Sequence, residues 1–503
     1  MAMIPAFDAF EAGWAEGRNQ LVYTRLAADL DTPVSLMLKL AEAQPMSFML
    51  ESVTGGEVRG RYSVVGLKPD VVWDCRGTQS RINRQARFDT DAFEALEGHP
   101  LDTLRALIAE SRIDMPEGIP AIAAGLFGYL GYDMIRLVEH LPNVNPDPIG
   151  VPDATLMRPT IIAVLDAVKS EVTVCSPAWI GSGLSARAAY AQAAERVMDA
   201  VRDLERTPAG ETRSLGDAAH LGEMKSNFTP EGYRAAVETA KNYIRAGDIF
   251  QVVPSQRWTA DFTLPPFALY RSLRRTNPSP FLTFFNFSSF HIVGASPEIL
   301  VRLRDDEVTV RPVAGTRPRG ATPDEDRALE ADLMADKKEL AEHLMLLDLG
   351  RNDVGRVAKV GSVHPTEKFI VERYSHVMHI VSNVVGEIRE DEDALSALLA
   401  GLPAGTVSGA PKVRAMEIID ELEPEKRGIY GGGVGYFAAN GEMDMCIALR
   451  TAVVKDEKLY IQAGGGVVYD SDPEAEFQET VNKSRALKAA AEDAGLFVRG
   501  GNS

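Results

Sequence analysis

The chain has 503 residues, of which 45% are hydrophobic and 25% charged, the balance of a folded globular protein. Asp and Glu outnumber Lys and Arg by 72 to 53, and the resulting net charge of −19 argues against binding to nucleic acid or to an anionic membrane. Cys75, Cys175 and Cys446 lie far apart without a CxxC motif, so we expect a protein of the reducing cytoplasm. Asp8 and Glu11 near the start disfavour a signal peptide.

The first 205 residues mix strand and helix patterns. Apolar runs at 61–67, 70–75 and 160–168 predict strands, and 185–204 predicts a helix. The stretch 206–227 is polar and rich in small residues, which is typical of a linker or long surface loop. We therefore expect an N-terminal domain over 1–205, this linker, and a second domain over 228–503.

A helix is expected directly after the linker. Thr229 can cap it, Pro230 suits its first position, and Glu231 faces the positive end of its dipole. Gly247 marks its end. The charge-free stretch 276–297 contains prolines, asparagines and a histidine, so it predicts buried strands with a turn and not a membrane span.

The remainder alternates between strands and helices. Strands are predicted at 249–258, 281–287, 291–296, 299–313, 428–438, 444–455 and 458–469. Helices are predicted at 324–347, 393–399, 411–422 and 473–494. Because many adjacent strands are joined by short turns with no helix between them, the pattern indicates antiparallel sheets and the α+β class.

Two of these helices carry paired carboxylates. Glu339 and Glu342 are three residues apart on one helix, and Glu476 and Glu479 are three apart on another, with Lys483 one turn later. Residues at this spacing share a helix face. If the two faces meet, oxygen-only ligands favour Mg²⁺. The alternative for each pair is a solvated charged face.

Six long segments between about residues 226 and 490 resemble the chorismate-utilising enzymes. They are SPEIL (296–300), RPVAGTRPRG (311–320), ADKKELAEHLMLLDLGRNDVGRV (335–357), PAGTVSGAPKVRAMEIIDELEP (403–424), YGGGVGY (430–436) and QAGGGVVYDSDPEAEFQETVNKSRA (462–486). With MLES (49–52), GRYSVVG (60–66) and NPSPF (277–281), the chain is similar to one branch of that family, the large subunits of anthranilate synthases.

This resemblance implies two intertwined α/β domains with an antiparallel β-sandwich core and flanking helices. It implies a Mg²⁺-dependent lyase that converts chorismate and ammonia to anthranilate and pyruvate, the first committed step of tryptophan biosynthesis. Glu342 and Glu479 would bind Mg²⁺, with Glu339 and Glu476 in support. The residues implied around chorismate are Gly315, Thr316, Tyr430, Arg450, Ala463, Gly464, Gly465, Gly466 and Lys483.

The resemblance also assigns roles in the reaction. Hydroxide is a poor leaving group, so amination at ring C2 with loss of the C4 hydroxyl needs a general acid, for which Glu298 stands at the matching position. Thr406 belongs to the same site. His379 is the candidate for assisting pyruvate loss; no HExxH motif accompanies it and His376, so a zinc site is not expected.

Two positions distinguish the branches of the family. Water-using relatives carry a lysine base where this chain has Gln251, and a neutral amide cannot deprotonate water, so ammonia is the implied nucleophile. Aminodeoxychorismate synthases carry a nucleophilic lysine where this chain has Ala314, whose methyl group cannot attack the ring. The alternative is that both are ordinary strand residues.

The resemblance further implies feedback inhibition by tryptophan, bound away from the chorismate cleft between MLES and NPSPF. The residues expected there are Leu50, Glu51, Ser52, Asn277, Pro280, Phe281 and Leu282. Glu51 and Ser52 would take the amino group, and residues 280–282 would wall the indole.

No cysteine lies in a glutaminase-like context, so we expect a separate glutamine amidotransferase subunit to supply ammonia within a hetero-oligomer. Two alternatives stay open at this point. One is another chorismate-aminating enzyme of the same fold, and the other is an inactive tryptophan sensor that regulates a partner.

Overall fold

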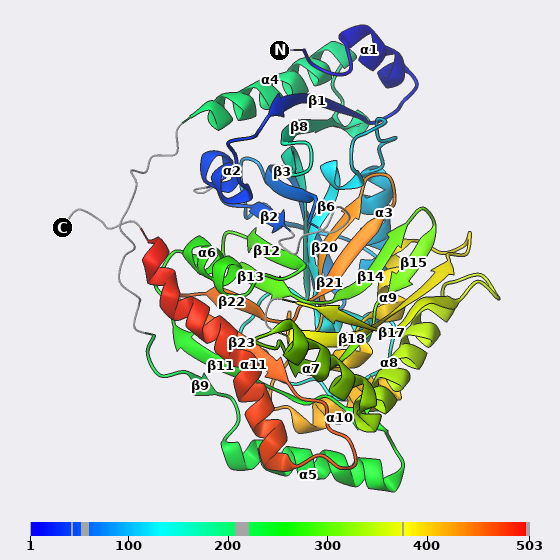
Figure 1. Cartoon of the computed structure of the whole chain (residues 1–503). Helices are drawn as coiled ribbons and strands as arrows, with labels where there is room; N and C mark the ends of the chain where they lie inside the picture. The colour runs from blue at the N-terminus through cyan, green and yellow to red at the C-terminus, as the bar shows by residue number, and fades with distance from the viewer. Residues whose placement is uncertain (1, 42–43, 52–59, 207–220, 375–376, 499–503) are drawn as a thin grey trace.

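One continuous network of 21 antiparallel strands among the described residues forms the frame of the fold, and it folds into two layers, called here the first and the second sheet, in the computed structural model of Figure 1. The structure describes residues 2–41, 44–51, 60–206, 221–374 and 377–498. By its pairings the first sheet runs β1 (Gln20–Ala27), β8 (Glu171–Ala178), β7 (Ala154–Asp166), β3 (Tyr62–Arg76), β2 (Ser47–Glu51), β12 (Phe281–Asn286), β13 (His291–Ser296), β22 (Thr451–Lys455), β23 (Lys458–Gly464), β11 (Ser255–Asp261) and β9 (Lys225–Ser226).

The second sheet shares β3 and β7 with the first. It runs β5 (Glu94–Ala95), β4 (Gln79–Asn83), β3, β7, β6 (Gly125–Leu130), β20 (Gly433–Ala438), β21 (Met443–Ile447), β14 (Ile299–Arg304), β15 (Glu307–Val310) and β18 (Val377–Glu387), with β16 (Val313–Pro318) and β17 (His364–Arg373) also paired to β18. A short ribbon joins β10 (Gln251–Val252) to β19 (Gly409–Ala410).

The long strands β3 and β7 hold the two sheets together. The first half of β3 pairs with β2 at Phe48↔Gly66, and its second half pairs with β4 at Val72↔Asn83. The register against β7 shifts between Pro69 and Val71, where the pair bends from one sheet to the other. Each end of these strands therefore belongs to a different layer.

Buried side chains from both sheets meet in one core layer between them. The ring of Phe48 from β2 stacks on Phe127 of β6 at 4.4 Å and on Phe285 of β12 at 5.4 Å. Burying one such phenylalanine stabilises the fold by about 1.5–3 kcal/mol. The prediction of an α+β fold with an antiparallel sandwich core is confirmed.

Helices cover the outer faces. Those on the first sheet are α2 (Pro33–Leu40), α4 (Ala186–Glu205), α6 (Pro266–Thr276) and α11 (Pro473–Asp493). Those on the second sheet are α3 (Pro100–Glu110), α8 (Lys337–Gly355) and α9 (Ala394–Gly401). The other elements are α1 (Phe7–Ala15), α5 (Pro230–Ala246), α7 (Pro323–Ala335), α10 (Lys412–Leu422), η1 (Ala121–Ala123), η2 (Tyr132–Leu137), η3 (Ile180–Ser182), η4 (Gly405–Val407) and η5 (Ala494–Phe497).

Strands from before and after the linker pair directly, β2 with β12 and β6 with β20. The two parts of the chain are thus interleaved in both sheets, and the division at 206–227 stays a prediction because residues 207–220 lie outside the described part. No helix in the described ranges is long and apolar enough to cross a membrane.

The expected helix after the linker is confirmed as α5, whose cap Thr229 accepts a hydrogen bond from the backbone of Gly232. The single helix expected over 324–347 is wrong. The chain breaks at Asp336, which is extended with ψ 105° and uses its carboxylate to accept from the backbone N–H groups of Lys338 and Glu339. A new helix, α8, starts there because those N–H groups have found a cap.

Candidate functional site

The glycine run Gly464–Gly466 at the end of β23 lies where several site segments meet. A Cβ on Gly464 would lie 2.8 Å from the Tyr430 hydroxyl, and one on Gly465 would lie 3.1 Å from the Glu476 carboxylate. On Gly466 it would lie 2.7 Å from the Gln251 amide nitrogen. Only glycine leaves room for all three polar groups beside the backbone.

The capping of α8 by Asp336 sets the direction of its two carboxylates. Glu339 lies 3.5 Å from the Arg317 guanidinium, and Glu342 accepts a 3.0 Å hydrogen bond from the Gln251 amide. Burial, and then the neighbouring charge of Glu342, raises the pKa of Glu339. The two carboxylates are therefore close enough to repel each other.

Replacing Asp336 with Ala should lower the free energy of unfolding by about 1 kcal/mol, because two backbone N–H groups of α8 lose their acceptor. Urea denaturation measures this. Asp336→Asn keeps the capping oxygen and should lose less. Asp336 also forms a 2.8 Å ion pair with Arg317, so equal losses in both variants would show that this charge, and not the cap, carries the effect.

The second pair of carboxylates lies on α11. Glu476 is buried and accepts from the Ser471 hydroxyl at 2.7 Å, while its other oxygen has no partner among the described residues. Burial raises the pKa of Glu476, and the charge of Glu479 adds to this. Lys483 pairs with Glu479 at 2.7 Å and donates to the carbonyl of Gly464 at 2.9 Å.

One carboxylate from each helix thus lies beside the glycine run, Glu476 at Gly465 and Glu342 at Gly466. The Glu342 oxygen lies 3.8 Å from the Cβ position of Gly466, the residue after the one that Glu476 faces. Across the described ranges, no three or more His, Cys, Asp and Glu side chains are gathered closely enough to hold a metal ion. An all-oxygen donor set with an orphaned carboxylate oxygen fits a hard cation that brings water and substrate oxygens of its own.

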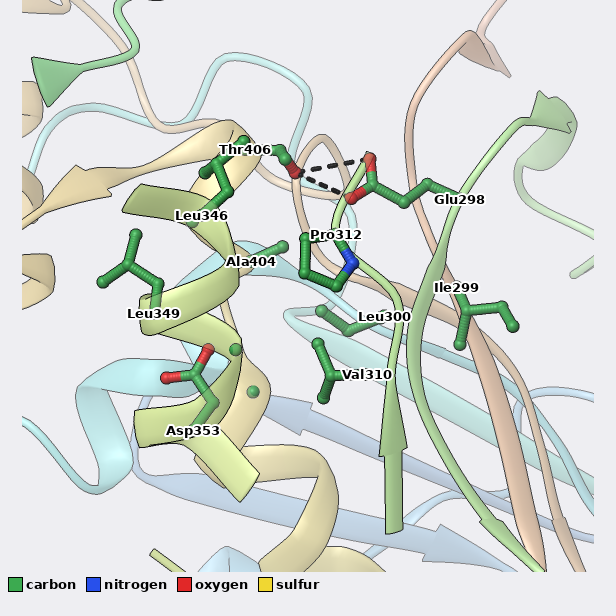
Figure 2. Close-up of a pocket in the computed structure, with 13 residues that line it drawn as sticks. Glu298, Ile299, Leu300, Val310, Pro312, Leu346, Leu349, Asp353, Ala404 and Thr406 are labelled. Atoms are coloured by element: carbon green, nitrogen blue, oxygen red, sulfur yellow. Dashed lines mark hydrogen bonds between the residues drawn. The ribbon is translucent and has the colours of Figure 1, made fainter. Parts of the chain in front are cut away.

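Glu298 and Thr406 form the second part of the site, shown in Figure 2. Glu298 directly precedes β14, Thr406 lies in η4, and the Thr406 hydroxyl is 3.3 and 3.4 Å from the two carboxylate oxygens. Burial raises the pKa of Glu298 to about 8, against the opposing effects of the Thr406 hydrogen bond and the Arg450 charge. Near neutral pH this carboxyl group therefore carries a proton that it can donate.

A cavity of about 20 Å³ adjoins this pair, which is room for about one water molecule. Its walls are mostly apolar, with Leu346 and Leu349 of α8 and Pro312 beside Glu298 (Figure 2). These walls keep bulk water away from the carboxyl group and account for its raised pKa.

His379 of β18 pairs with Thr316 of β16 in the sheet. Its Nδ1 lies 3.0 Å from the carbonyl oxygen of Gly315 and 3.1 Å from the Thr316 hydroxyl. A carbonyl can only accept, so Nδ1 carries the proton and Nε2 has the lone pair. Burial lowers the pKa of His379, which favours this neutral base.

Arg450 and Tyr430 supply donors. Arg450 is partly buried and forms no ion pair within the part of the chain that the structure describes, so its charge is available to an anion. Burial raises the pKa of Tyr430 to about 12, which keeps its hydroxyl a donor. Ala463 is buried in β23 next to the glycine run.

The predicted regulatory residues come together at a different place, between β2 and β12, where Glu51 pairs with Leu282 and Leu50 with Thr283. Asn277 ends α6 with a buried side-chain nitrogen that finds no partner among the described residues. Pro280 and Phe281 are partly buried beside them, and Ser52 lies outside the described residues.

Glu51 already has partners that the sequence analysis missed. It is buried, forms an ion pair with Arg274 of α6, and accepts from the Tyr270 hydroxyl at 2.6 Å. Tyr270 and Arg274 are one helical turn apart, but no local signal connects them with a residue more than 200 positions earlier.

The sequence pattern of the chorismate binding enzymes matches residues 68–489 of this chain. A protein of Cereibacter sphaeroides named anthranilate synthase component 1 is 80% identical over 494 residues, covering 98% of this chain and 99% of that protein. One of Pseudomonas putida with the same name is 52% identical, covering 92% of each.

The chain belongs to the anthranilate synthase component 1 branch of the chorismate-binding enzymes. The crystal structure of anthranilate synthase component I from Streptococcus pneumoniae agrees, with a TM-score of 0.76 and 39% identity over 87% of this chain and 93% of that one. An isochorismate synthase, MenF of Escherichia coli, shares the fold at 19% identity and a TM-score of 0.70, over 96% of this chain and 99% of that one. The predicted family and enzyme class are confirmed, and "component 1" indicates a multi-component enzyme.

Proposed function

We propose that this anthranilate synthase component aminates chorismate at ring C2 with ammonia and then releases pyruvate, with Glu298 as the general acid. The observation that carries the assignment is the buried Glu298 beside the Thr406 hydroxyl, where burial raises the pKa of the carboxyl group to about 8. An acid with a pKa near the working pH is suited to protonating a leaving hydroxyl group. Gln251 stands where a base would be needed to activate water, and a neutral amide cannot deprotonate water. This residue therefore supports ammonia as the nucleophile.

In the first step a C–N bond forms at C2 and the C4–O bond breaks. Glu298 gives its proton to the departing hydroxyl group, which leaves as water, and the new ammonium group returns a proton to the carboxylate. In the second step Nε2 of His379 takes the C2 proton, and the C3–O bond breaks to release pyruvate as its enolate. The substrate ring becomes aromatic, and the enolate takes up the proton that His379 returns, directly or through solvent, to give pyruvate.

Binding of chorismate, a dianion, needs positive charge and donors. Arg450, the Tyr430 hydroxyl and Lys483 are available for the carboxylates, and the amides of Gly464–Gly466 can approach closely. Gly315 and Thr316 hold His379 beside the ring. These roles extend the confirmed family assignment to individual residues.

Mg²⁺ is the proposed cofactor, held by Glu342 and Glu479 with Glu339 and Glu476 in support. When bound it supplies a positive centre that neutralises a substrate carboxylate. The supporting observations are the all-oxygen donor set on α8 and α11 and the raised pKa values of Glu339 and Glu476, which burial and then a neighbouring carboxylate on the same helix bring about.

We propose that a partner subunit with glutamine amidotransferase activity supplies the ammonia. The two kinds of subunit would form a hetero-oligomer in the cytoplasm. The chain's three cysteines are all buried, and burial raises the pKa of each thiol, so none is a ready thiolate nucleophile for glutamine. Ammonium salt should replace the partner in solution.

Incubation of the chain with chorismate, Mg²⁺ and ammonium at pH 8 should give fluorescent anthranilate and pyruvate in a 1:1 ratio. EDTA should abolish both products, and excess Mg²⁺ should restore them. Formation of isochorismate, or of an aminated product without pyruvate, would contradict the proposed reaction. No turnover at saturating ammonium would instead favour an inactive sensor.

Tryptophan is the proposed feedback inhibitor, bound beside the paired strands β2 and β12 with its ammonium group on Glu51. Glu51→Gln should raise the tryptophan concentration for half-inhibition by at least about tenfold, because a charge-assisted contact is lost. Each protein's inhibition is measured relative to its own activity without tryptophan. Asp74→Asn, which alters another buried carboxylate paired with an arginine, is the matched control. Equal tryptophan sensitivity in all three proteins would place the inhibitor elsewhere.

A further inference from the structure

A buried ion pair lies behind the site and takes no part in the reaction proposed above. The Arg427 and Glu423 side chains are 1% and 3% exposed and form a bidentate contact, with Nε donating to both carboxylate oxygens at 3.1 and 3.0 Å. Nη2 adds a third bond of 2.6 Å to Glu423. Such desolvated pairs persist only where every donor and acceptor is satisfied.

The remaining donors of Arg427 reach the backbone of two site segments. Nη1 donates to the carbonyl of Val407 at 2.5 Å, and Nη2 donates to that of Val253 at 2.6 Å. Val407 directly follows Thr406, and Val253 is two residues after Gln251. The Arg427 guanidinium therefore holds two segments of the site. One is η4, which carries Thr406, the hydrogen-bond partner of Glu298. The other carries Gln251, the hydrogen-bond partner of Glu342.

Glu423 extends the same network to the glycine run. Its Oε1 accepts from the backbone N–H and the hydroxyl of Ser255 at 2.7 and 2.8 Å, and Gln462 donates to that hydroxyl at 2.8 Å. Ser255 is paired with Gly464 across β11 and β23. The Arg427 guanidinium also lies over the ring of Tyr430, 5.5 Å from its centroid.

We propose that the Arg427–Glu423 pair is a positioning device of the active site, which holds η4, the Gln251 strand, the glycine run and Tyr430 in register for catalysis. This inference rests on the proposed function. Neither residue touches the reacting atoms, and the pair acts through the backbone of Val253, Val407 and Ser255. Its loss should therefore lower kcat more than it changes the KM for chorismate.

The test compares Arg427→Lys with the wild type in the ammonium assay. Lysine keeps the charge but cannot make a bidentate contact and bond two backbone carbonyls at once. We expect kcat to fall at least about tenfold while KM changes less than about threefold. Arg158→Lys is the matched control, since the Arg158 side chain is 4% exposed and bidentate with Asp70, and its side-chain bonds among the described residues go to Asp70, Glu110 and Ser111, away from the site.

A pH profile separates positioning from general loss of structure. Thr406 and Arg450 both favour the charged form of Glu298, so displacing Thr406 should move the alkaline limb of kcat to higher pH. Arg427→Lys should shift that limb in the same direction as Thr406→Val. A smaller fraction of folded protein would lower kcat by the same factor at every pH and would leave the alkaline limb at the same pH.

The double variant Glu423→Leu with Arg427→Met covers the case in which the single variant does not fold, because apolar replacement of a buried pair often preserves stability. Because it leaves no single buried charge unpaired, it should unfold at a higher midpoint than a variant that removes only one of the two charges, and it should still lose kcat. Wild-type kcat in either folded variant, or a loss without the pH shift, would overturn the inference. An inactive wild type would instead refute the proposed function.

Discussion

Glu298→Gln is expected to lower ammonia-dependent kcat by about 10²–10⁴-fold, the range for removing a positioned general acid. Glutamine keeps the size of the side chain and can still accept from Thr406, so the KM for chorismate should change little. Stopped-flow or steady-state anthranilate fluorescence measures both constants. A kcat within a few-fold of the wild type would remove Glu298 from the acid role.

The same role of Glu298 predicts how kcat depends on pH. The acid must be protonated to act, and burial raises the pKa of Glu298 to about 8, so kcat should fall as pH rises through about 8. Thr406→Val removes a hydrogen bond that lowers this pKa, so the falling limb should move to higher pH. A limb that stays in place in Thr406→Val, or persists in Glu298→Gln, would belong to another group.

Replacing Glu342 or Glu479 with Gln should abolish Mg²⁺-stimulated turnover at the Mg²⁺ concentrations that saturate the wild type. Removing a ligand carboxylate should raise the Mg²⁺ concentration for half activation by at least about tenfold. Glu474→Gln is the matched control, since Glu474 lies on the same helix but is exposed and paired with Arg234. Unchanged activation in both Glu342→Gln and Glu479→Gln would exclude them as ligands.

Helix starts and face-sharing pairs could be predicted because they depend on near neighbours. Thr229 caps α5 as expected, and each glutamate pair lies on one helix, although Glu339 and Glu342 lie on α8 and not on a helix that runs from 324 to 347. The break at Asp336 was missed because an aspartate inside a helical pattern can point to solvent or cap a new helix, and only packing decides. Pro33, Pro100 and Pro266 mark the starts of three helices that the analysis did not identify.

Long-range pairing could not be predicted from local pattern. Nothing near MLES or NPSPF shows that β2 and β12 are adjacent strands, or that Arg274 would bind Glu51. The Arg427–Glu423 pair is only four residues apart, but its role depends on carbonyls contributed by distant segments. For the site, the motifs identified the residues, and the fold supplied their partners.

The most direct test of the central claim is a count of divalent ions bound to the full chain. Mn²⁺ can replace Mg²⁺ at oxygen sites and is visible by electron paramagnetic resonance. With chorismate and no ammonium, we expect one bound Mn²⁺ per chain in the wild type and in Glu474→Gln, and none in Glu342→Gln combined with Glu479→Gln. Equal Mn²⁺ binding in the doubly substituted chain would contradict the convergence of α8 and α11 on one ion.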